Sequence, residues 1–377
     1  MLTGLDLLAE GRDVGLAGRR LALLVNPTAV DRRGRHAVEI LRSLAGPAAV
    51  DVVRLLGPEH GVWGTHQDME PVAGGTLDPV FALPAVSLYG ATRDSLAPRP
   101  EAFDGIDGVV YDLQDIGARY YTFAATLAFV MAAAAEQGLP VWVLDRPNPI
   151  GPRVEGPLLQ PGFESFCGIT PGLPIRHGLS VGGLARYYRD RLAPRCDLRV
   201  VPYEGDGDAP WVPPSPNMPT RDTAYVYPGL CLLEGTTVSE GRGTTSPFLT
   251  FGAPGVPPLA LADALRARGC PGVDVVPTVF RPAFGKHAGA QCGGAYLRVR
   301  DAAALESVAL GVHVLAALRE VAPASFGWRR DAYEFVTDVP AIDLLWGSPA
   351  LRETLDRGGD VAPLLAEARR DAALFHP

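Results

Sequence analysis

The 377-residue chain lacks several features that define broad classes of protein. No apolar run approaches the roughly 20 residues of a membrane-spanning helix, so no membrane span is expected. The net charge at pH 7 is −8 and no basic cluster occurs, which argues against nucleic acid as a partner. The first twenty residues carry Asp6, Glu10 and Asp13 and have no uninterrupted apolar core. We therefore expect no signal peptide and a cytoplasmic location, with export as the alternative.

Signatures of cofactor and metal sites are missing as well. The sequence has no G-x-G-x-x-G, no G-x-x-x-x-G-K-[ST], no G-x-S-x-G and no H-E-x-x-H, so nucleotide and zinc chemistry are disfavoured. We expect neither a cofactor nor a metal. The cysteines form no C-x-x-C pair and show no ligand spacing, which predicts inert, reduced thiols. The five of them are Cys167, Cys196, Cys231, Cys270 and Cys292.

The chain is rich in Gly and Pro, with 43 and 36 residues, and this indicates many turns and long shaped loops. Between residues 21 and 203, strand-like apolar runs alternate with helical patterns, which predicts βαβ units and a parallel sheet. Strands are expected at 21–26, 50–56, 85–89, 108–112, 141–145 and 198–203, and helices at 33–44, 121–137 and 181–192. A Pro-rich stretch, 206–228, predicts a rigid irregular crossing between two domains.

After this crossing the pattern changes to α+β. It predicts helices at 259–267, 302–321, 341–344, 349–356 and 361–372, and strands at 273–280 and 295–299. The fold class expected is therefore α/β, a Rossmann-like parallel sheet domain followed by a smaller α+β C-terminal domain. We place the catalytic domain at residues 1–225 and the auxiliary domain, contributing to the cleft, at 226–377.

Polar residues follow the predicted strands directly. In an open parallel sheet, ligands bind beyond the carboxyl ends of the strands, so these side chains are expected at one edge. Amides, carboxylates and arginines of this kind suit a sugar or similar polyol better than a phosphate. The residues are Asn26, Glu59, His60, Tyr111, Asp112, Gln114, Asp115, Arg119, Asp145, Arg146 and Asn148.

The segment GPEHG (57–61) is the sharpest local feature. Its two glycines permit a tight turn and close approach of a ligand. Glu59 is presented at a strand end with Trp63 nearby, and a carboxyl beside an aromatic wall suits a general acid. The alternative is that Glu59 caps the following turn. Strand-end loops carry functional sites disproportionately, which favours the functional interpretation.

Other candidates have structural alternatives too. Asp115 could cap a helix, and Arg119 could pair with Asp112 or Asp115. Glu155 is a second carboxyl candidate or a surface charge. Arg176 could clamp a carboxylate, whereas a lone histidine such as His177 is more often structural. The segment EGTTVSEGRGTTSPF (234–248), with Glu234, Glu240 and Arg242, is either a ligand-facing loop or a set of turns.

Long motifs in one order along the chain resemble a known family. They include NPTAV (26–30), GPEHG, SLYG (87–90), YDLQDIGARYYT (111–122), LDRPNPIGP, VEGPLL (154–159), PIRHGLSVGGLA (174–185), WVPPSPNMPT (211–220) and YPGLCLLEGTTVSEGRGTT (227–245). Together they are similar to the bacterial exo-β-N-acetylmuramidases, the NamZ-type peptidoglycan-recycling glycosidases. The resemblance runs from about residue 20 to 255. The sequence departs from the family pattern at 63–69 and 203–210.

The resemblance implies release of N-acetylmuramic acid from the non-reducing ends of peptidoglycan fragments, with a peptidoglycan-derived sugar as the substrate. Glu59 is then the leading catalytic carboxylate, acting as general acid, and Glu155, Asp112 or Asp115 is its partner, in falling order. Arg119 or Arg176 would grip the lactyl carboxylate. The full expected substrate-binding set is Asn26, His60, Tyr89, Gln114, Arg119, Asp145, Arg146, Asn148, Arg176, His177, Asn217, Glu240 and Arg242.

Two other classes of function stay open. One is a carbohydrate-binding protein with the same cleft but no turnover. The other is a nucleotide-dependent α/β enzyme, which the missing phosphate loops disfavour. The sequence predicts neither the stereochemical course nor the oligomeric state.

Overall fold

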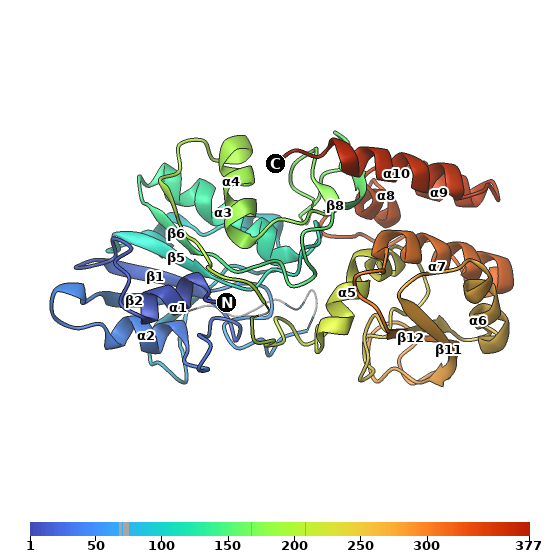
Figure 1. The fold of residues 1–377 in the computed structure, drawn as a ribbon, viewed down its shortest axis with the longest axis horizontal. Coiled ribbons are helices and arrows are strands. Elements are labelled where there is room, and N and C mark those ends of the chain that lie inside the picture. The colour runs from blue at the N-terminus through green and yellow to red at the C-terminus, as the bar shows by residue number, and fades with distance from the viewer. Residues whose placement is uncertain (68–69, 71–74, 167, 208) are drawn as a thin grey trace.

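A computed structural model describes residues 1–67, 70, 75–166, 168–207 and 209–377 (Figure 1). Cys167, whose thiol is predicted to be inert, lies outside the described residues. So do residues 68 and 69, the last of the divergent segment 63–69. Figure 1 shows a parallel sheet with its helices at one end of the molecule and a smaller α+β part at the other. Among the residues described, no helix is both long and apolar enough to cross a membrane.

The N-terminal part contains a seven-stranded sheet with the order β3-β4-β2-β1-β5-β6-β9. Six of the strands run parallel, and the short β3 pairs antiparallel with β4. The predicted parallel sheet is therefore confirmed. The strands are β1 (Arg20–Val25), β2 (Asp51–Gly57), β3 (Thr76–Leu77), β4 (Pro84–Ser87), β5 (Gly108–Asp112), β6 (Val141–Leu144) and β9 (Leu198–Val201).

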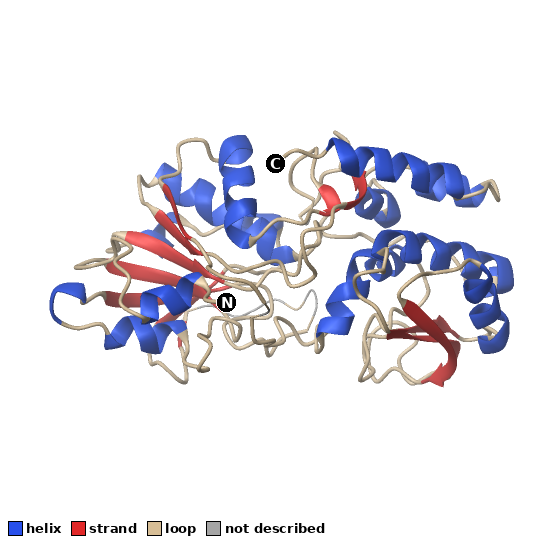
Figure 2. Cartoon of the chain, in the orientation of Figure 1, coloured by secondary structure: helices blue, strands red, loops and turns tan. Residues whose placement is uncertain are grey.

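Helices cover both faces of this sheet, and the side chains of β1 show why. Leu21, Leu23 and Val25 point to the face covered by α1 and α2, whereas Ala22 and Leu24 point to the face covered by α3. Successive strand residues alternate between faces, so a strand with helices on both sides must be apolar throughout. The helices are α1 (Gly4–Ala9), α2 (Ala37–Ser43), α3 (Thr122–Glu136) and α4 (Val181–Leu192). Figure 2 shows α1 and α2 on one side of the sheet and α3 and α4 on the other.

The C-terminal part is α+β, as predicted. Its antiparallel sheet has the order β10-β12-β11, and a separate hairpin, β7 with β8, precedes it in the chain. The strands of the C-terminal sheet are β10 (Thr250–Ala253), β11 (Val273–Phe280) and β12 (Cys292–Val299), and the hairpin strands, which come before the crossing, are β7 (Glu155–Leu158) and β8 (Pro174–Arg176). The helices are α5 (Arg221–Leu230), α6 (Pro258–Ala267), α7 (Ser307–Val321), α8 (Ala341–Trp346), α9 (Ala350–Asp356) and α10 (Ala362–Leu374). Short 3-10 turns are η1 (Gly46–Ala48), η2 (Arg93–Leu96), η3 (Pro100–Phe103), η4 (Cys231–Gly235) and η5 (Pro323–Ser325).

The Pro-rich crossing is shorter than predicted, because its last part is the helix α5. Thr220 caps this helix by accepting a hydrogen bond from the backbone N–H of Thr223 at 3.2 Å. Pro228 lies in the final turn of α5, where it removes one backbone donor. The expected domain boundary at 225/226 falls inside α5.

Helix α5 and helix α7 approach each other closely. A Cβ atom on Gly229 would lie 1.8 Å from the carbonyl oxygen of Ser307, so only glycine fits there. One apolar cluster extends from β5, through α5 and α7, to Trp346 of α8. This shared core holds the C-terminal part against the loops that leave the parallel sheet.

Candidate active site

A cavity lies where loops from both parts of the chain meet. We call it the central cavity. Most of its wall residues are buried; Tyr89 and Phe248 are each 1 % exposed and Glu59 is 3 % exposed. The wall consists of Glu59, His60, Tyr89, Tyr120, Tyr121, Thr122, Phe166, Ser215, Asn217, Met218, Tyr227, Glu234, Arg242, Phe248, Tyr333 and Glu334.

Glu59 reaches the cavity through the turn that follows β2. His60 has a φ of 68° and Gly61 a φ of 79°, so the chain turns sharply just beyond the end of β2 at Gly57. The ring of His60 is held by a contact of 2.9 Å between its Nδ1 and the carbonyl oxygen of His66. Its Nε2 lies 3.9 Å from Glu59 Oε2. The GPEHG segment thus directs a carboxylate and an imidazole into the cavity wall.

Two further carboxylates line the cavity, and both come from the C-terminal part. Glu234, in η4, accepts a hydrogen bond from Arg242 Nη1 at 2.6 Å and another from the Tyr333 hydroxyl at 2.9 Å. Glu334 accepts a hydrogen bond from Ser165 Oγ at 3.0 Å and has a φ of 49°. These contacts fix the orientation of both side chains.

Neither Glu234 nor Glu334 was predicted as a catalytic carboxylate. Glu234 belongs to the Thr-, Ser- and Gly-rich segment 234–248, so a composition signal did point to its neighbourhood. Glu334 stands in a short turn with no motif around it, and nothing in the local sequence distinguishes it from a surface charge.

Aromatic side chains form much of the remaining wall. The Tyr227 ring packs edge-to-face on Phe248 at 4.8 Å between centroids and on Tyr121 at 5.9 Å. Burial raises the pKa of Tyr121 far above its usual value, and the charges of Asp115 and Glu59 add to this shift. The hydroxyl therefore stays protonated at neutral pH and can donate a hydrogen bond. Apolar walls with a few fixed polar groups are typical of small-molecule sites.

The structure brings only part of the predicted set to this cavity. The predicted residues on its wall are Glu59, His60, Tyr89, Asn217 and Arg242. Asn217 lies in the Pro-rich crossing, where its side-chain amide donates a hydrogen bond to Gln67 at 3.2 Å. The other predicted residues lie elsewhere, and their contacts explain why.

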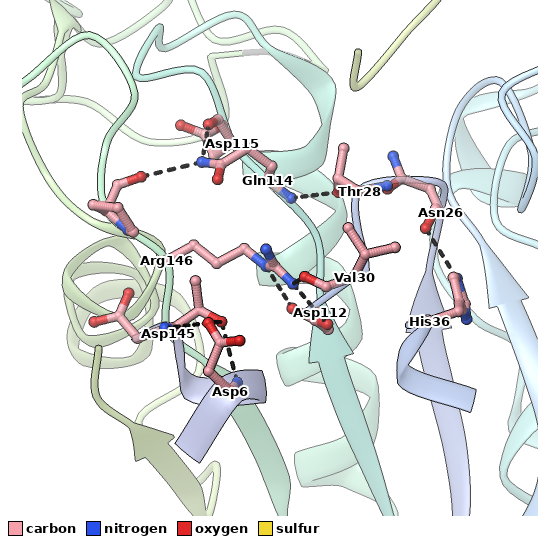
Figure 3. Close-up of polar contacts among 12 residues, drawn as sticks. Asp6, Asn26, Thr28, Val30, His36, Asp112, Gln114, Asp115, Asp145 and Arg146 are labelled. Carbon is pink, nitrogen blue, oxygen red and sulfur yellow. Dashed lines mark hydrogen bonds and ion pairs between the residues drawn. The ribbon is translucent and has the colours of Figure 1, made fainter. Parts of the chain in front are cut away.

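Several strand-end residues bind one another instead of facing the cavity (Figure 3). Arg146 contacts both oxygens of the fully buried Asp112, at 2.6 Å and 3.0 Å, and the carbonyl oxygen of Val30. The Asn26 side chain accepts hydrogen bonds from the backbone and hydroxyl of Thr28. Gln114 donates through its side chain to the carbonyl oxygens of Asp115 and Pro147. The network ties the loops of the sheet edge together.

Asp145, Asn148 and Asp115 are also used for local structure. Asp145 accepts hydrogen bonds from Gly182 N at 2.7 Å and Ser180 Oγ at 3.1 Å, at the start of α4. Burial raises the pKa of Asp145, although these hydrogen bonds oppose the shift. The Asn148 side chain donates a hydrogen bond to the carbonyl oxygen of Leu179 and accepts one from the backbone N–H of Ile150. Asp115 accepts from Gly117 N at 2.6 Å and lies 3.4 Å from Nε2 of the buried His177.

The two arginines expected to grip a carboxylate are both in structural roles. Arg119 is 1 % exposed and donates to the carbonyl oxygens of Pro157, Leu173 and Leu345. Burial lowers the pKa of Arg119 to about 10, which still leaves it charged at neutral pH.

Arg176 pairs with Glu155, the first choice as partner carboxylate. Arg176 Nη1 lies 2.6 Å from Glu155 Oε1, and Glu155 Oε2 accepts a hydrogen bond from Val308 N at 3.1 Å. This pair joins the β7–β8 hairpin to the first turn of α7. Glu155 is therefore outside the central cavity.

Glu240 lies behind the cavity wall in a buried charge cluster. Lys286 Nζ lies 2.9 Å from one of its oxygens and Arg242 Nη1 lies 3.3 Å from the other. Burial by itself would raise the pKa of Glu240, but Lys286 and Arg242 outweigh it and lower the pKa from 4.5 to about 2.

In the described part of the chain, no three His, Cys, Asp or Glu side chains are grouped to hold a metal ion.

The depressed pKa of Glu240 predicts a pH-dependent contribution to stability. A carboxylate whose pKa is lowered by folding stabilises the protein above its ordinary pKa, and this contribution is lost as pH falls from about 4.5 to about 2. We expect Glu240→Gln to reduce the free energy of unfolding at pH 7 by about 3 kcal/mol. Urea unfolding at pH 7 and at pH 3 measures this, with a smaller difference at pH 3. An equal difference at both pH values would contradict the assignment.

Comparison with known proteins agrees with this architecture. Family models described as the N-terminal and C-terminal parts of exo-beta-N-acetylmuramidase NamZ match residues 21–222 and 225–377. The peptidoglycan beta-N-acetylmuramidase NamZ of Bacillus subtilis is 37% identical over 372 residues, which is 96% of this chain and 86% of that protein.

Two crystal structures of DUF1343 family proteins from Bacteroides fragilis share the fold. One has a TM-score of 0.82 and 29% identity, over 100% of this chain and 98% of that one. The other has a TM-score of 0.72 and 26% identity, over 99% of this chain and 96% of that one. The chain belongs to the exo-β-N-acetylmuramidase NamZ family.

Proposed function

We propose that the protein is a glycosidase that removes N-acetylmuramic acid from the non-reducing end of peptidoglycan fragments. The name of the Bacillus subtilis relative supports the substrate class. The observation that carries the proposal is the placement of Glu59, from the N-terminal part, and Glu234, from the C-terminal part, on the wall of the same cavity. Glycoside hydrolysis ordinarily uses two carboxyl groups that flank the scissile bond.

In this proposal Glu59 protonates the glycosidic oxygen as that bond breaks. Glu234 is the second carboxylate, in place of Glu155, Asp112 and Asp115, because it lines the cavity and they do not. Its contacts with Arg242 and Tyr333 hold it in one orientation, as an oxocarbenium-stabilising or water-activating group requires. Glu334 is the other carboxylate on this wall.

The shape of the cavity favours attack at a chain end. Most of its wall side chains are buried, which suits a terminal sugar residue enclosed by the protein rather than the middle of a polysaccharide. The wall residues Tyr333 and Glu334 come from a turn of the C-terminal part, far along the chain from Glu59. Both parts of the chain are therefore required to form the site.

Product analysis on a defined disaccharide tests the proposal. The wild-type protein is incubated with N-acetylmuramic acid β-linked to N-acetylglucosamine, and free N-acetylmuramic acid is expected by mass spectrometry. Binding of the disaccharide without release of either sugar would instead identify a carbohydrate-binding protein that has no turnover.

A further inference from the structure

We propose that Arg242 binds the lactyl carboxylate of N-acetylmuramic acid and thereby selects this sugar over N-acetylglucosamine. The inference rests on the proposed function and assigns one step of substrate recognition to one side chain. The two sugars share the ring and the acetamido group, so the lactyl ether with its carboxylate is the feature that a selective site must recognise.

The charges on the wall of the central cavity point to this residue. Three of the wall residues are carboxylates, Glu59, Glu234 and Glu334, and such a wall repels a further anion. Among the wall residues that the structure describes, Arg242 is the one arginine, and no lysine is present. A carboxylate that leaves water for a mostly buried cavity requires a cation at hydrogen-bonding distance. In this inference, Arg242 supplies the cation that the lactyl carboxylate needs.

Arg242 is held rigidly enough to act as a recognition group. Its guanidinium lies over the Phe248 ring, 5.0 Å from the centroid, and its Nη1 lies 2.6 Å from Glu234 and 3.3 Å from Glu240. The side chain is 13% exposed. A guanidinium carries five N–H donors in a planar fork, so it can hold more than one carboxylate at the same time.

Lys286 makes this arrangement electrostatically possible. Its Nζ lies 2.9 Å from Glu240 and also donates to the carbonyl oxygens of Leu233 and Val238. Lys286 therefore shares the neutralisation of Glu240 with Arg242. Arg242 also pairs with Glu234 at 2.6 Å, so the substrate carboxylate shares the guanidinium with Glu234. Arg119 and Arg176 lie outside the cavity wall and cannot take this role.

A substrate series tests the inference without altering the protein. Three chromogenic β-glycosides are compared: that of N-acetylmuramic acid, its lactyl methyl ester, and that of N-acetylglucosamine. The ester removes the charge of the lactyl group and enlarges it by one methyl group. For the wild-type protein we expect kcat/KM on the acid to exceed that on the ester at least 10-fold. A ratio near 1 would overturn the inference, even if all variants failed to fold.

The Arg242→Gln variant then identifies the cation. We expect kcat/KM to fall on both substrates, because Arg242 also orients Glu234, but to fall at least 10-fold more on the acid than on the ester, so that the ratio of the two approaches 1. Arg329→Gln is the matched control, because Arg329 lies 5.2 Å from the Tyr333 ring but not on the cavity wall. This control is expected to keep the wild-type ratio.

The outcomes separate this inference from the proposed function. Equal losses on acid and ester in Arg242→Gln would show that Arg242 only positions Glu234, and the inference would fail while the glycosidase stands. A folded wild-type protein that cleaves none of the three glycosides, nor the disaccharide, would overturn the proposed function and this inference with it.

Discussion

Replacing Glu59 by Gln is expected to lower kcat by about 10²- to 10⁴-fold, the usual contribution of a general acid or base. The amide has nearly the shape of the carboxyl group but cannot transfer a proton to the leaving oxygen. Glu59 is 3 % exposed in a tight turn, so the isosteric change is expected to leave the fold intact. Release of N-acetylmuramic acid from the disaccharide measures the loss, and circular dichroism checks the fold.

The leaving group shows whether Glu59 acts as the acid. A dinitrophenolate departs without protonation, whereas a sugar alcohol does not. The loss in Glu59→Gln should therefore be much smaller on a dinitrophenyl glycoside than on the disaccharide. Equal losses on both would assign Glu59 to another role, and near-normal turnover on the disaccharide would remove it from the mechanism.

Glu155→Gln is the informative companion to this experiment. Glu155 is paired with Arg176 and lies outside the cavity, so its replacement should reduce stability while the folded protein keeps its turnover. A loss of kcat comparable with that of Glu59→Gln would restore Glu155 as the partner carboxylate.

Removing Asp112 is expected to have the largest effect on stability. Asp112 is fully buried, and Asp112→Ala leaves the buried Arg146 guanidinium without its carboxylate. Breaking a buried ion pair in this way costs about 3–5 kcal/mol in the free energy of unfolding. The value is measured by urea denaturation at neutral pH.

A second substitution separates the charge effect from the lost contacts. In Asp112→Ala/Arg146→Met no unpaired charge remains, so the double variant should be more stable than Asp112→Ala alone. If Asp112→Ala unfolded like the wild-type protein but lost turnover, Asp112 would belong to the catalytic group and the structural assignment would be wrong.

The fold followed from the sequence in most of its elements. Elements with a strong pattern, such as the mainly apolar strands β5 and β6 and the amphipathic helix α4, were predicted within a residue or two. Burial on both faces of a strand, or along one stripe of a helix, leaves a pattern that is plain in the sequence. The helix α5 was missed because Pro228 and the prolines before it predict irregular chain. Its helical state depends on packing against α7, and the close approach at Gly229 is not visible locally.

The candidate site was less predictable. Glu59 could be singled out because it follows a buried strand and stands between glycines that permit a tight turn. Glu334 could not, since its turn joins the cavity only through the folding of the C-terminal part. Asp112, Arg146 and Gln114 show the opposite case, in which strand-end residues with the right chemistry satisfy one another.

The sequence by itself therefore determined the family, the layered α/β architecture and the position of the sheet edge, because these depend on periodicity, burial and long motifs. Only the tertiary structure decided which polar side chains line the cavity and which form the internal network. Carboxylates, amides and arginines are equally suited to binding a sugar and to binding loops together. The difference is made by partners from other loops, such as Arg146 for Asp112, which either bind a side chain in the interior or leave it facing the cavity.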